Sequence, residues 1–383
     1  MGLIADALAR HVDAGDVPGV VALVARGDEG DVTVLGDQAY GGAAMRADSL
    51  FRIASAGKPI TAAAVLALVA DGRLALRDAV DDLLPELAAP RVLRAATAAL
   101  GDTVPASRSI TVEDLLRSTN GHGFPADFSG PVIQLLVERL HQGPPRPQLT
   151  PPPDEWMAAL RTVPLVHQPG EGFAYNTAFD ILGVLVARVT GQPFADFVAH
   201  RILQPLGMTD TGFTFPAGSA ARTTSYYRLA DGAHAELVDG PDGQWTTPPA
   251  FPSGAGGYVS TAADLLGFHR MVLAGGGDVL PADLVAAMTA DQLTPRIRAT
   301  NPVFLNGQSW GYGGGVDVER RDPWNVPGRY GWVGGTGTSA YAVPADGSVA
   351  IVLTQMELGG PAGAAVLESF WSAAASVLGH SSA

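Results

Sequence analysis

The sequence predicts an α+β protein in which both ends of the chain form one lobe, an antiparallel sheet flanked by helices. Strand patterns occur between residues 20 and 36 and return after about residue 308, whereas residues 73–270 read mostly as helices separated by Pro- and Gly-rich loops. We therefore expect residues 1–75 and 271–383 to form an α/β lobe and residues 76–270 to form a mostly helical inserted lobe. An active site is expected in the cleft between the two lobes.

The N-terminal part predicts a helix, a hairpin and a second helix. An amphipathic pattern covers about residues 3–14, and apolar runs at 20–25 and 32–36 flank the turn Gly-Asp-Glu-Gly at 27–30. This arrangement is typical of an antiparallel hairpin. The second helix is expected to begin near Ser55 and to end at an Asp-Gly stop after the apolar run that follows.

The rest of the chain continues this pattern. We expect a capped helix to begin at Thr111. Further helices are expected at 131–137, 179–186 and 361–378, and strands at 316–318, 339–343 and 349–354. The Pro-rich segment 143–153 is expected to be a surface loop. Loops at about 104–110, 141–154 and 216–252 are expected to shape the pocket.

Composition excludes several classes of function. The 383 residues carry a formal net charge of −14 and no basic run, so we expect no nucleic-acid partner. The chain has no cysteine, which excludes disulfides, thiolate metal sites and a cysteine nucleophile. No apolar stretch reaches the roughly 18 residues that a membrane span needs, and the N-terminus lacks a signal-peptide pattern. We therefore expect a cytoplasmic protein without a membrane partner.

Motifs for metals, nucleotides and the Ser-His-Asp elbow are missing. The eight histidines show no metal-ligand spacing, and the glycine clusters at 275–277 and 313–315 are not followed by the Lys-Ser/Thr of a phosphate loop. No Gly-x-Ser-x-Gly occurs. We expect neither a metal nor a cofactor.

The most informative segment is Ser-Ala-Gly-Lys at residues 55–58, directly before an apolar helical run. In a helix that begins near Ser55, residues three apart lie on one face, which places the Ser55 hydroxyl beside the Lys58 amine. Pro59 is tolerated only in a first helical turn and places the helix start there independently. The pattern suits an acylating serine whose proton passes to an amine, but an isolated match also fits an N-cap serine and a solvated lysine.

Further segments accompany this one in the order seen in one family. Residues 169–183 resemble a loop with a catalytic tyrosine, Tyr175, that enters a helix, and residues 331–338 occupy the place of a third motif on a late strand. Residues 51–53 and 256–264 also match. Over nearly its whole length the chain resembles the class C β-lactamase-like serine hydrolases, which share the Ser-x-x-Lys motif. The resemblance implies a β-lactamase/transpeptidase-like fold and an acyl-enzyme mechanism.

Two departures from the family pattern favour an esterase. The usual Tyr-x-Asn is replaced here, because Thr177 stands at the third position and Asn176 one place early, where we expect it to face another way. The third motif begins with Trp332 rather than Lys or His, so the cation that helps to hold a β-lactam carboxylate is missing. A Trp-x-Gly motif is similar to that of some family VIII carboxylesterases.

The resemblance also implies the catalytic roles. Ser55 attacks the carbonyl of a small or medium ester and forms an acyl-enzyme, which water then hydrolyses. Tyr175 is implied as the base, kept partly phenolate by the Lys58 ammonium; which of the two is the base stays open. The oxyanion hole is implied to consist of the backbone N–H groups of Ser55 and Gly335.

Four residues are candidates for substrate binding. Trp332 is expected to form an apolar wall of the pocket, with Gly334 next to it on the same motif. Asn176 and His122 are the other two, His122 because it lies beside the place where the family has a turn near the cleft.

Other functions remain open on this scaffold. A β-lactamase, a D-amino-acid amidase or peptidase, and a transacylase would all use the same acyl-enzyme chemistry. A non-catalytic binding protein is the alternative from another class, and the presence of Ser55, Lys58 and Tyr175 together argues against it.

Overall fold

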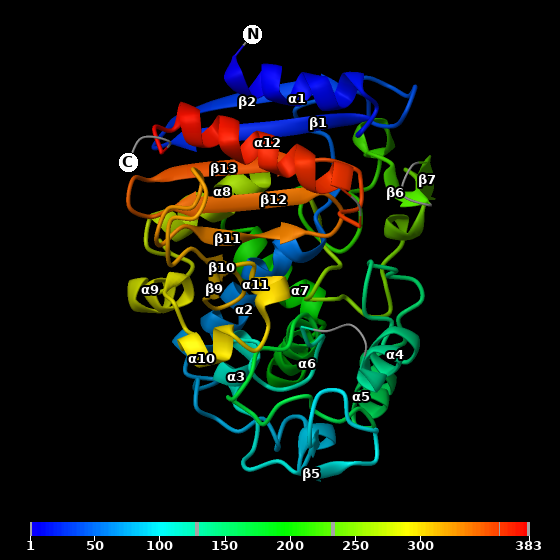
Figure 1. The fold of residues 1–383 in the computed structure, drawn as a ribbon, viewed down its shortest axis with the longest axis vertical. Coiled ribbons are helices and arrows are strands. Elements are labelled where there is room, and N and C mark those ends of the chain that lie inside the picture. Colours follow the sequence, from blue (N-terminus) through cyan, green and yellow to red (C-terminus); the bar gives the residue numbers. More distant parts are fainter. Residues whose placement is uncertain (1, 127–129, 231–233, 360, 381–383) are drawn as a thin grey trace.

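A seven-stranded antiparallel sheet drawn from both ends of the chain forms one side of the molecule, and helices and loops fill the other (Figure 1). We describe a computed structural model over residues 2–126, 130–230, 234–359 and 361–380. The strand order is β2-β1-β13-β12-β11-β10-β9. The predicted α+β class and the sheet built from both termini are therefore confirmed.

The sheet joins the N-terminal hairpin to the C-terminal strands. Its strands are β1 (Gly19–Arg26), β2 (Glu29–Gly36), β9 (Ser309–Trp310), β10 (Gly315–Val316), β11 (Tyr330–Gly334), β12 (Thr338–Val343) and β13 (Ser348–Leu353). The hairpin pairs Gly19 with Gly36, and β1 pairs with β13 so that Val21 faces Leu353. All but the last residue of β1 are buried, because the sheet is covered on both faces.

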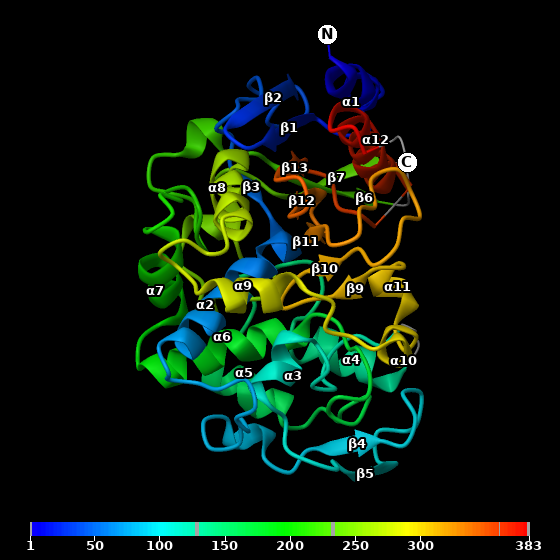
Figure 2. The same ribbon diagram turned by 90° about the vertical axis from the view of Figure 1, so that its left-hand side faces the viewer.

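Helices cover the two faces of the sheet. Helices α1 (Leu3–Asp13) and α12 (Pro361–Val377) pack against each other on one face, and α8 (Ala262–Leu273) packs against β12 and β13 on the other (Figures 1 and 2). The remaining helices are α2 (Lys58–Ala70), α3 (Val112–Leu116), α4 (Pro131–Glu138), α5 (Pro153–Leu160), α6 (Thr177–Thr190), α7 (Phe194–Val198), α9 (Ala282–Thr289), α10 (Pro295–Arg298) and α11 (Pro302–Leu305).

Helix α2 lies in the interior between the sheet and the helical part. Every residue from Lys58 to Leu68 is buried, and the helix packs against α6, α7, α9 and β11. A helix that is apolar all round is expected to be buried on all sides. The predicted helix is present, but its first residues, Ala54–Gly57, form a short 3-10 helix, η1, and the α-helix begins at Lys58.

Other elements predicted from sequence are also present. Thr111 caps α3, because its hydroxyl accepts from the Asp114 backbone N–H while the Asp114 carboxylate accepts from the Thr111 N–H. The Pro-rich segment 143–153 leads from α4 into α5, which begins at Pro153. The division into two lobes stays a prediction, and its boundary at residues 270/271 falls inside α8.

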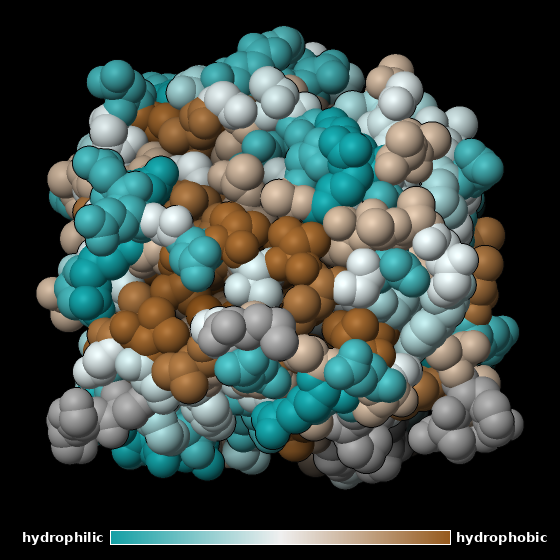
Figure 3. Space-filling model, turned by 90° about the horizontal axis from the view of Figure 1, so that it is seen from above, coloured by the Kyte–Doolittle hydropathy of each residue, from teal (hydrophilic) through white to brown (hydrophobic). Residues whose placement is uncertain are grey.

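The end of the molecule with α1 and β2 carries a central apolar area surrounded by hydrophilic side chains (Figure 3). Large apolar side chains that are exposed on α1, β2 and α12 include Leu3, Val32 and Val377. Within the described part of the chain no single helix is long and apolar enough to cross a membrane, and one bent pair, Thr177–Thr190 with Phe194–Leu203, passes that test on length and composition only.

A buried ion pair anchors the strand that leads to Ser55. Strand β3 (Phe51–Arg52) pairs with β8 (Val259–Ser260), and Arg52 Nε donates to Asp239 Oδ2 at 2.9 Å. The guanidinium also donates to the Thr224 carbonyl at 2.7 Å and to the Gly240 carbonyl at 2.8 Å. The side chains of Arg52 and Asp239 are only 1% and 4% exposed, so the pair ties this strand to strand β7 (His234–Asp239) without help from solvent.

We predict that Asp239→Ala lowers the free energy of unfolding by about 3–5 kcal/mol, because it leaves the Arg52 charge buried and unpaired. Chemical denaturation followed by circular dichroism would measure this loss. The matched control is Asp48→Ala, which removes the partner of Arg46 in an ion pair whose side chains are 50% and 56% exposed, and little change is expected there. Equal losses in the two variants would contradict the prediction.

Candidate active site

Ser55 and Lys58 lie side by side because the chain makes a 3-10 turn between them. Such a turn has three residues per turn, so positions i and i+3 are aligned. The Lys58 Nζ is 2.7 Å from the Ser55 Oγ. The turn is entered through Ala54, whose φ of +44° is unusual for a residue with a side chain. Such strained conformations are concentrated at functional sites.

The amine of Lys58 is fully buried and has two further partners. Its Nζ donates to Asn176 Oδ1 at 2.8 Å and to the carbonyl oxygen of Ala255 at 2.6 Å. Burial lowers the pKa of Lys58 to about 7, and the charge of Asp180 opposes this shift. When the amine is neutral, its two N–H groups remain with these two acceptors, and its lone pair is left to face the Ser55 hydroxyl.

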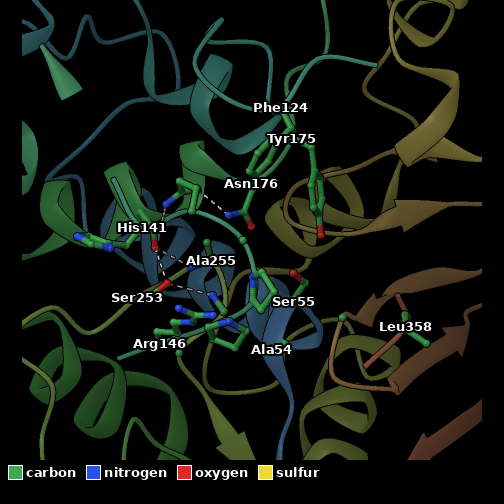
Figure 4. Close-up of a pocket in the computed structure, with 18 of the residues that line it drawn as sticks. Ala54, Ser55, Phe124, His141, Arg146, Tyr175, Asn176, Ser253, Ala255 and Leu358 are labelled. Atoms are coloured by element: carbon green, nitrogen blue, oxygen red, sulfur yellow. Dashed lines mark hydrogen bonds between the residues drawn. The ribbon is translucent and has the colours of Figure 1, made fainter. Parts of the chain in front are cut away.

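Tyr175 lies two residues before α6, and its hydroxyl is hydrogen-bonded to Ser55 and to Trp332 of β11. Its hydroxyl is directed toward Ser55 (Figure 4), and it accepts a hydrogen bond from Trp332 Nε1 at 2.6 Å. Its ring stacks on Phe304 with centroids 4.3 Å apart. Burial raises the pKa of Tyr175 to about 12, and its hydrogen bonds to Ser55 and Trp332 oppose the shift only in part.

The partly phenolate Tyr175 expected from the sequence is therefore not favoured. The Lys58 Nζ lies 4.7 Å from the centroid of the tyrosine ring, over its face, and donates its hydrogen bonds elsewhere. A buried phenol without a cation at its oxygen keeps its proton at neutral pH. The Lys58 Nζ, by contrast, is in hydrogen-bond contact with the Ser55 Oγ at 2.7 Å.

Strand β11 brings its motif against the turn that carries Ser55. A Cβ on Gly334 would lie 2.2 Å from the Ile53 carbonyl oxygen, so only glycine permits this approach. The Thr338 hydroxyl donates to the same carbonyl at 2.9 Å. The next residue, Gly335, lines the cavity together with Ser55.

A cavity of about 770 Å³ opens in front of Ser55, with Tyr175, Trp332 and Gly335 on its walls. Apolar side chains make up much of the remaining lining: Leu140, Phe251, Val303, Phe304 and Leu358. Loops 141–154 and 216–252 contribute residues to it, as expected. Within the described residues, loop 104–110 contributes none.

The four candidate substrate-binding residues have different positions. Trp332 and Asn176 line the cavity. The sequence led us to expect that Asn176 faces another way, but its Oδ1 faces Lys58 and accepts a hydrogen bond from it. Gly334 does not line it, because its role is the close contact with Ile53.

The expectation for His122 is also wrong. Its Nε2 donates to the Val163 carbonyl at 3.1 Å in the interior, away from the residues that line the cavity. Burial lowers its pKa to about 4, so the ring is neutral. Its neighbour Gly123 has a positive φ and lies so close to the Tyr175 carbonyl that a Cβ would be 2.4 Å from it. This loop therefore supports Tyr175 from behind.

Sequence reasoning missed a set of polar residues behind Lys58. Gln142, Asp180, Ser253 and Ala255 connect by hydrogen bonds to one another or to Asn176. The sequence did offer a sign of Asp180, because it is a lone carboxylate in the apolar run that forms α6. In the structure its exposed fraction is 3%. Gln142 lies next to a Pro-rich loop and carried none.

Comparisons with known proteins identify the family of this chain. The family model described as Beta-lactamase matches residues 4–368. Protein Rv1367c of Mycobacterium tuberculosis (strain ATCC 25618 / H37Rv) is 39% identical over 330 residues, which are 82% of this chain and 79% of the relative. Esterase EstB of Burkholderia gladioli is 34% identical over 316 residues, 77% of this chain and 74% of the relative.

A solved structure supports the fold. The structure described as "EstCE1, a hydrolase with promiscuous acyltransferase activity" matches with a TM-score of 0.77 at 22% identity, over 96% of this chain and 97% of that one. The resemblance stated from the motifs is confirmed. The chain belongs to the beta-lactamase family and is a serine hydrolase within it.

Proposed function

We propose that the protein is a carboxylesterase that hydrolyses small or medium esters through an acyl-enzyme on Ser55, with Lys58 as the base. The observation that carries this proposal is the Lys58 amine, which is fully buried, 2.7 Å from the Ser55 Oγ and bound on its other sides by two oxygen acceptors. A neutral amine in this setting has its lone pair on the serine proton. The esterase relative adds support.

Acylation begins when Lys58 Nζ takes the hydroxyl proton of Ser55 as the Oγ bonds to the ester carbonyl carbon. The backbone N–H groups of Ser55 and Gly335 are assigned to the oxyanion that forms. The C–O bond to the alcohol then breaks, and the alcohol receives the proton from Lys58, relayed through the Tyr175 hydroxyl, since both groups are hydrogen-bonded to the Ser55 Oγ. In deacylation water gives its proton to Lys58 and attacks the acyl carbon, after which Ser55 regains a proton and the acid leaves.

The substituted motifs favour an ester over a β-lactam. Thr177, at the position of the family's usual Asn, is fully buried and donates to Gln142 Oε1 at 3.2 Å, so it offers nothing to an acylamide side chain. Trp332 occupies the place of the usual cation, and its N–H is engaged by Tyr175. Both changes leave the groups around Ser55 intact.

Acyl transfer to an alcohol is a second candidate function. The cavity of about 770 Å³ lies in the upper part of the usual range for ligand pockets and leaves room for an acceptor beside an acyl group. The hydrolase EstCE1, which shares the fold, is described as a promiscuous acyltransferase. Product analysis with an added primary alcohol would separate ester formation from hydrolysis.

We predict that a fluorophosphonate forms one covalent adduct on the wild-type protein and none on Ser55→Ala, because only an activated hydroxyl reacts. Intact-protein mass spectrometry would detect the adduct. The wild type should also hydrolyse p-nitrophenyl acetate and butyrate but not nitrocefin, and Ser55→Ala should hydrolyse none of them. Turnover of nitrocefin at rates similar to the esters would instead favour a β-lactamase.

The pH dependence of kcat/KM would distinguish Lys58 from Tyr175 as the base. Lys58 acts only when neutral, so kcat/KM should be level above pH about 7 and fall as Lys58 becomes protonated below it. Tyr175, with a pKa of about 12, should add no limb between pH 7 and 10. Tyr175→Phe should therefore lower the rate and keep the acid limb. Loss of that limb in Tyr175→Phe would assign the base to the tyrosine.

We predict that Trp332→Phe lowers kcat by about 10-fold or more, since it removes one buried hydrogen bond, worth about 1–3 kcal/mol, from the Tyr175 hydroxyl. The aromatic wall of the pocket is retained, so KM should change little. The matched control is Trp371→Phe on α12, which removes a similar hydrogen bond to the Ser339 hydroxyl away from the cavity. Steady-state kinetics on p-nitrophenyl butyrate would compare the two, and equal kcat values would contradict the prediction.

A further inference from the structure

A chain of amide groups connects the Lys58 amine to a buried carboxylate on α6. Lys58 Nζ donates to Asn176 Oδ1 at 2.8 Å, and Asn176 Nδ2 donates to Gln142 Oε1 at 2.6 Å. Gln142 Nε2 in turn donates to Asp180 Oδ2 at 2.6 Å. All four side chains are largely removed from solvent, so each of these hydrogen bonds replaces one to water.

A second path closes the ring on the other side of Asp180. Its Oδ1 accepts from the Ser253 hydroxyl at 2.6 Å and from the backbone N–H of Ala255 at 3.1 Å. The carbonyl of the same Ala255 accepts from Lys58 Nζ at 2.6 Å. Figure 4 shows Ser253, Ala255 and Asn176 on the same side of Ser55. Both acceptors of the lysine are therefore held by groups that are bound to one carboxylate.

The carboxylate determines the direction of every hydrogen bond in the amide path. An ionised carboxylate only accepts, so Gln142 must turn its NH₂ toward Asp180 and its oxygen toward Asn176. Asn176 must then turn its NH₂ toward Gln142 and its oxygen toward Lys58. The Thr177 hydroxyl also donates to Gln142 Oε1, at 3.2 Å, which supports the same orientation.

We propose that Asp180 is a positioning residue that orients the amides of Gln142 and Asn176 and so keeps two acceptors on Lys58, leaving the third direction of the amine for Ser55. This inference rests on the proposed Lys58-assisted mechanism. It explains why a carboxylate lies within the apolar part of α6, where burial without partners would be costly.

Few other titratable groups face Lys58. Buried tyrosines lie against α2: Tyr175 has its ring beside Lys58 Nζ, the Tyr258 hydroxyl is hydrogen-bonded to Thr61, and Tyr330 is on β11. Burial raises the pKa of all three. The other ionisable side chains of α6, α7, α9 and the short helical segment Ala199–Leu203, which pack against α2, are at least partly exposed: Arg188, Asp196, His200, Arg201 and Asp283. Asp180 is thus the buried charge that acts on the Lys58 ammonium. Burial raises the pKa of Asp180, and its hydrogen bonds from Ser253, Gln142 and the Ala255 N–H, together with the Lys58 charge, oppose that rise.

Asp180→Asn tests the direction of the ring. Either orientation of the new carboxamide places its NH₂ against a donor, on the side of Gln142 or on the side of the Ala255 N–H. If the new NH₂ faces Gln142, two donors meet unless the Gln142 carboxamide rotates to present its oxygen. The Asn176 carboxamide must then rotate as well, which points its NH₂ group at Lys58. The lost negative charge also makes the ammonium less stable, so the acid limb of the pH profile should move to lower pH.

The double variant Asp180→Asn/Gln142→Glu restores both properties. The carboxamide at position 180 can donate to the carboxylate introduced at position 142, which still accepts from Asn176 and Thr177. Every donor again faces an acceptor, and one buried negative charge is kept. Gln142→Glu alone places two carboxylates against each other and should be impaired, because one of them must take up a proton.

The experiment compares the wild type, Asp180→Asn, Gln142→Glu and the double variant. For each protein, kcat on p-nitrophenyl butyrate is measured as a function of pH. Fluorophosphonate labelling and thermal unfolding are measured on the same proteins. We expect each single variant to lose about 100-fold or more in kcat, within the usual contribution of a general base. The double variant should recover most of this loss and return the acid limb toward its wild-type position. Asp264→Asn is the control, since Asp264 on α8 also accepts from a hydroxyl and a backbone N–H but does not line the cavity, and its pH profile should match the wild type.

Two results would overturn the inference: an Asp180→Asn variant with wild-type kcat and acid limb, or a folded double variant no more active than Gln142→Glu. The second comparison holds even where Asp180→Asn does not fold. A wild-type protein that hydrolyses no ester and takes up no label would contradict the proposed function itself, which is a different outcome.

Discussion

Burial of one amine is the constraint on which the rest of the site depends. Lys58 is completely removed from solvent, and an ammonium in that position is stable only if its hydrogen bonds are supplied by the protein. Two oxygens and the Ser55 hydroxyl supply them. The same burial lowers the pKa of Lys58 to about 7, which suits the role of base that we propose for it at neutral pH. Burial of the Lys58 amine thus accounts both for the hydrogen bonds that surround it and for its lowered pKa.

The position of Ser55 is held from several directions at once. The 3-10 turn aligns it with Lys58, the close contact at Gly334 brings β11 beside it, and the Arg52–Asp239 pair fixes the strand that precedes it. These supports come from distant parts of the sequence. A nucleophile needs such support because small displacements from the reactive geometry reduce the rate strongly.

The cavity combines this fixed chemistry with an apolar interior. Trp332 belongs to both parts of the site, because its ring lines the apolar cavity while its N–H donates to the Tyr175 hydroxyl. Relatives of this family include the esterase EstB, and the shared fold includes a hydrolase with acyltransferase activity. Loops are the more variable parts of a fold, so the loops that line this cavity are where we expect its choice of substrate to be determined.

The sequence by itself determined the fold class, the main helices and strands, and the pairing of Ser55 with Lys58. These follow from local periodicity, turn residues and a spacing of three, which are all readable along the chain. Only the tertiary structure decided that Asn176 faces Lys58, that His122 lies away from the cavity, and that Asp180 closes a ring behind the amine. These facts depend on contacts between residues far apart in sequence. The pKa of Tyr175 depends on the tertiary structure in the same way, because burial raises it and burial is a property of the whole fold.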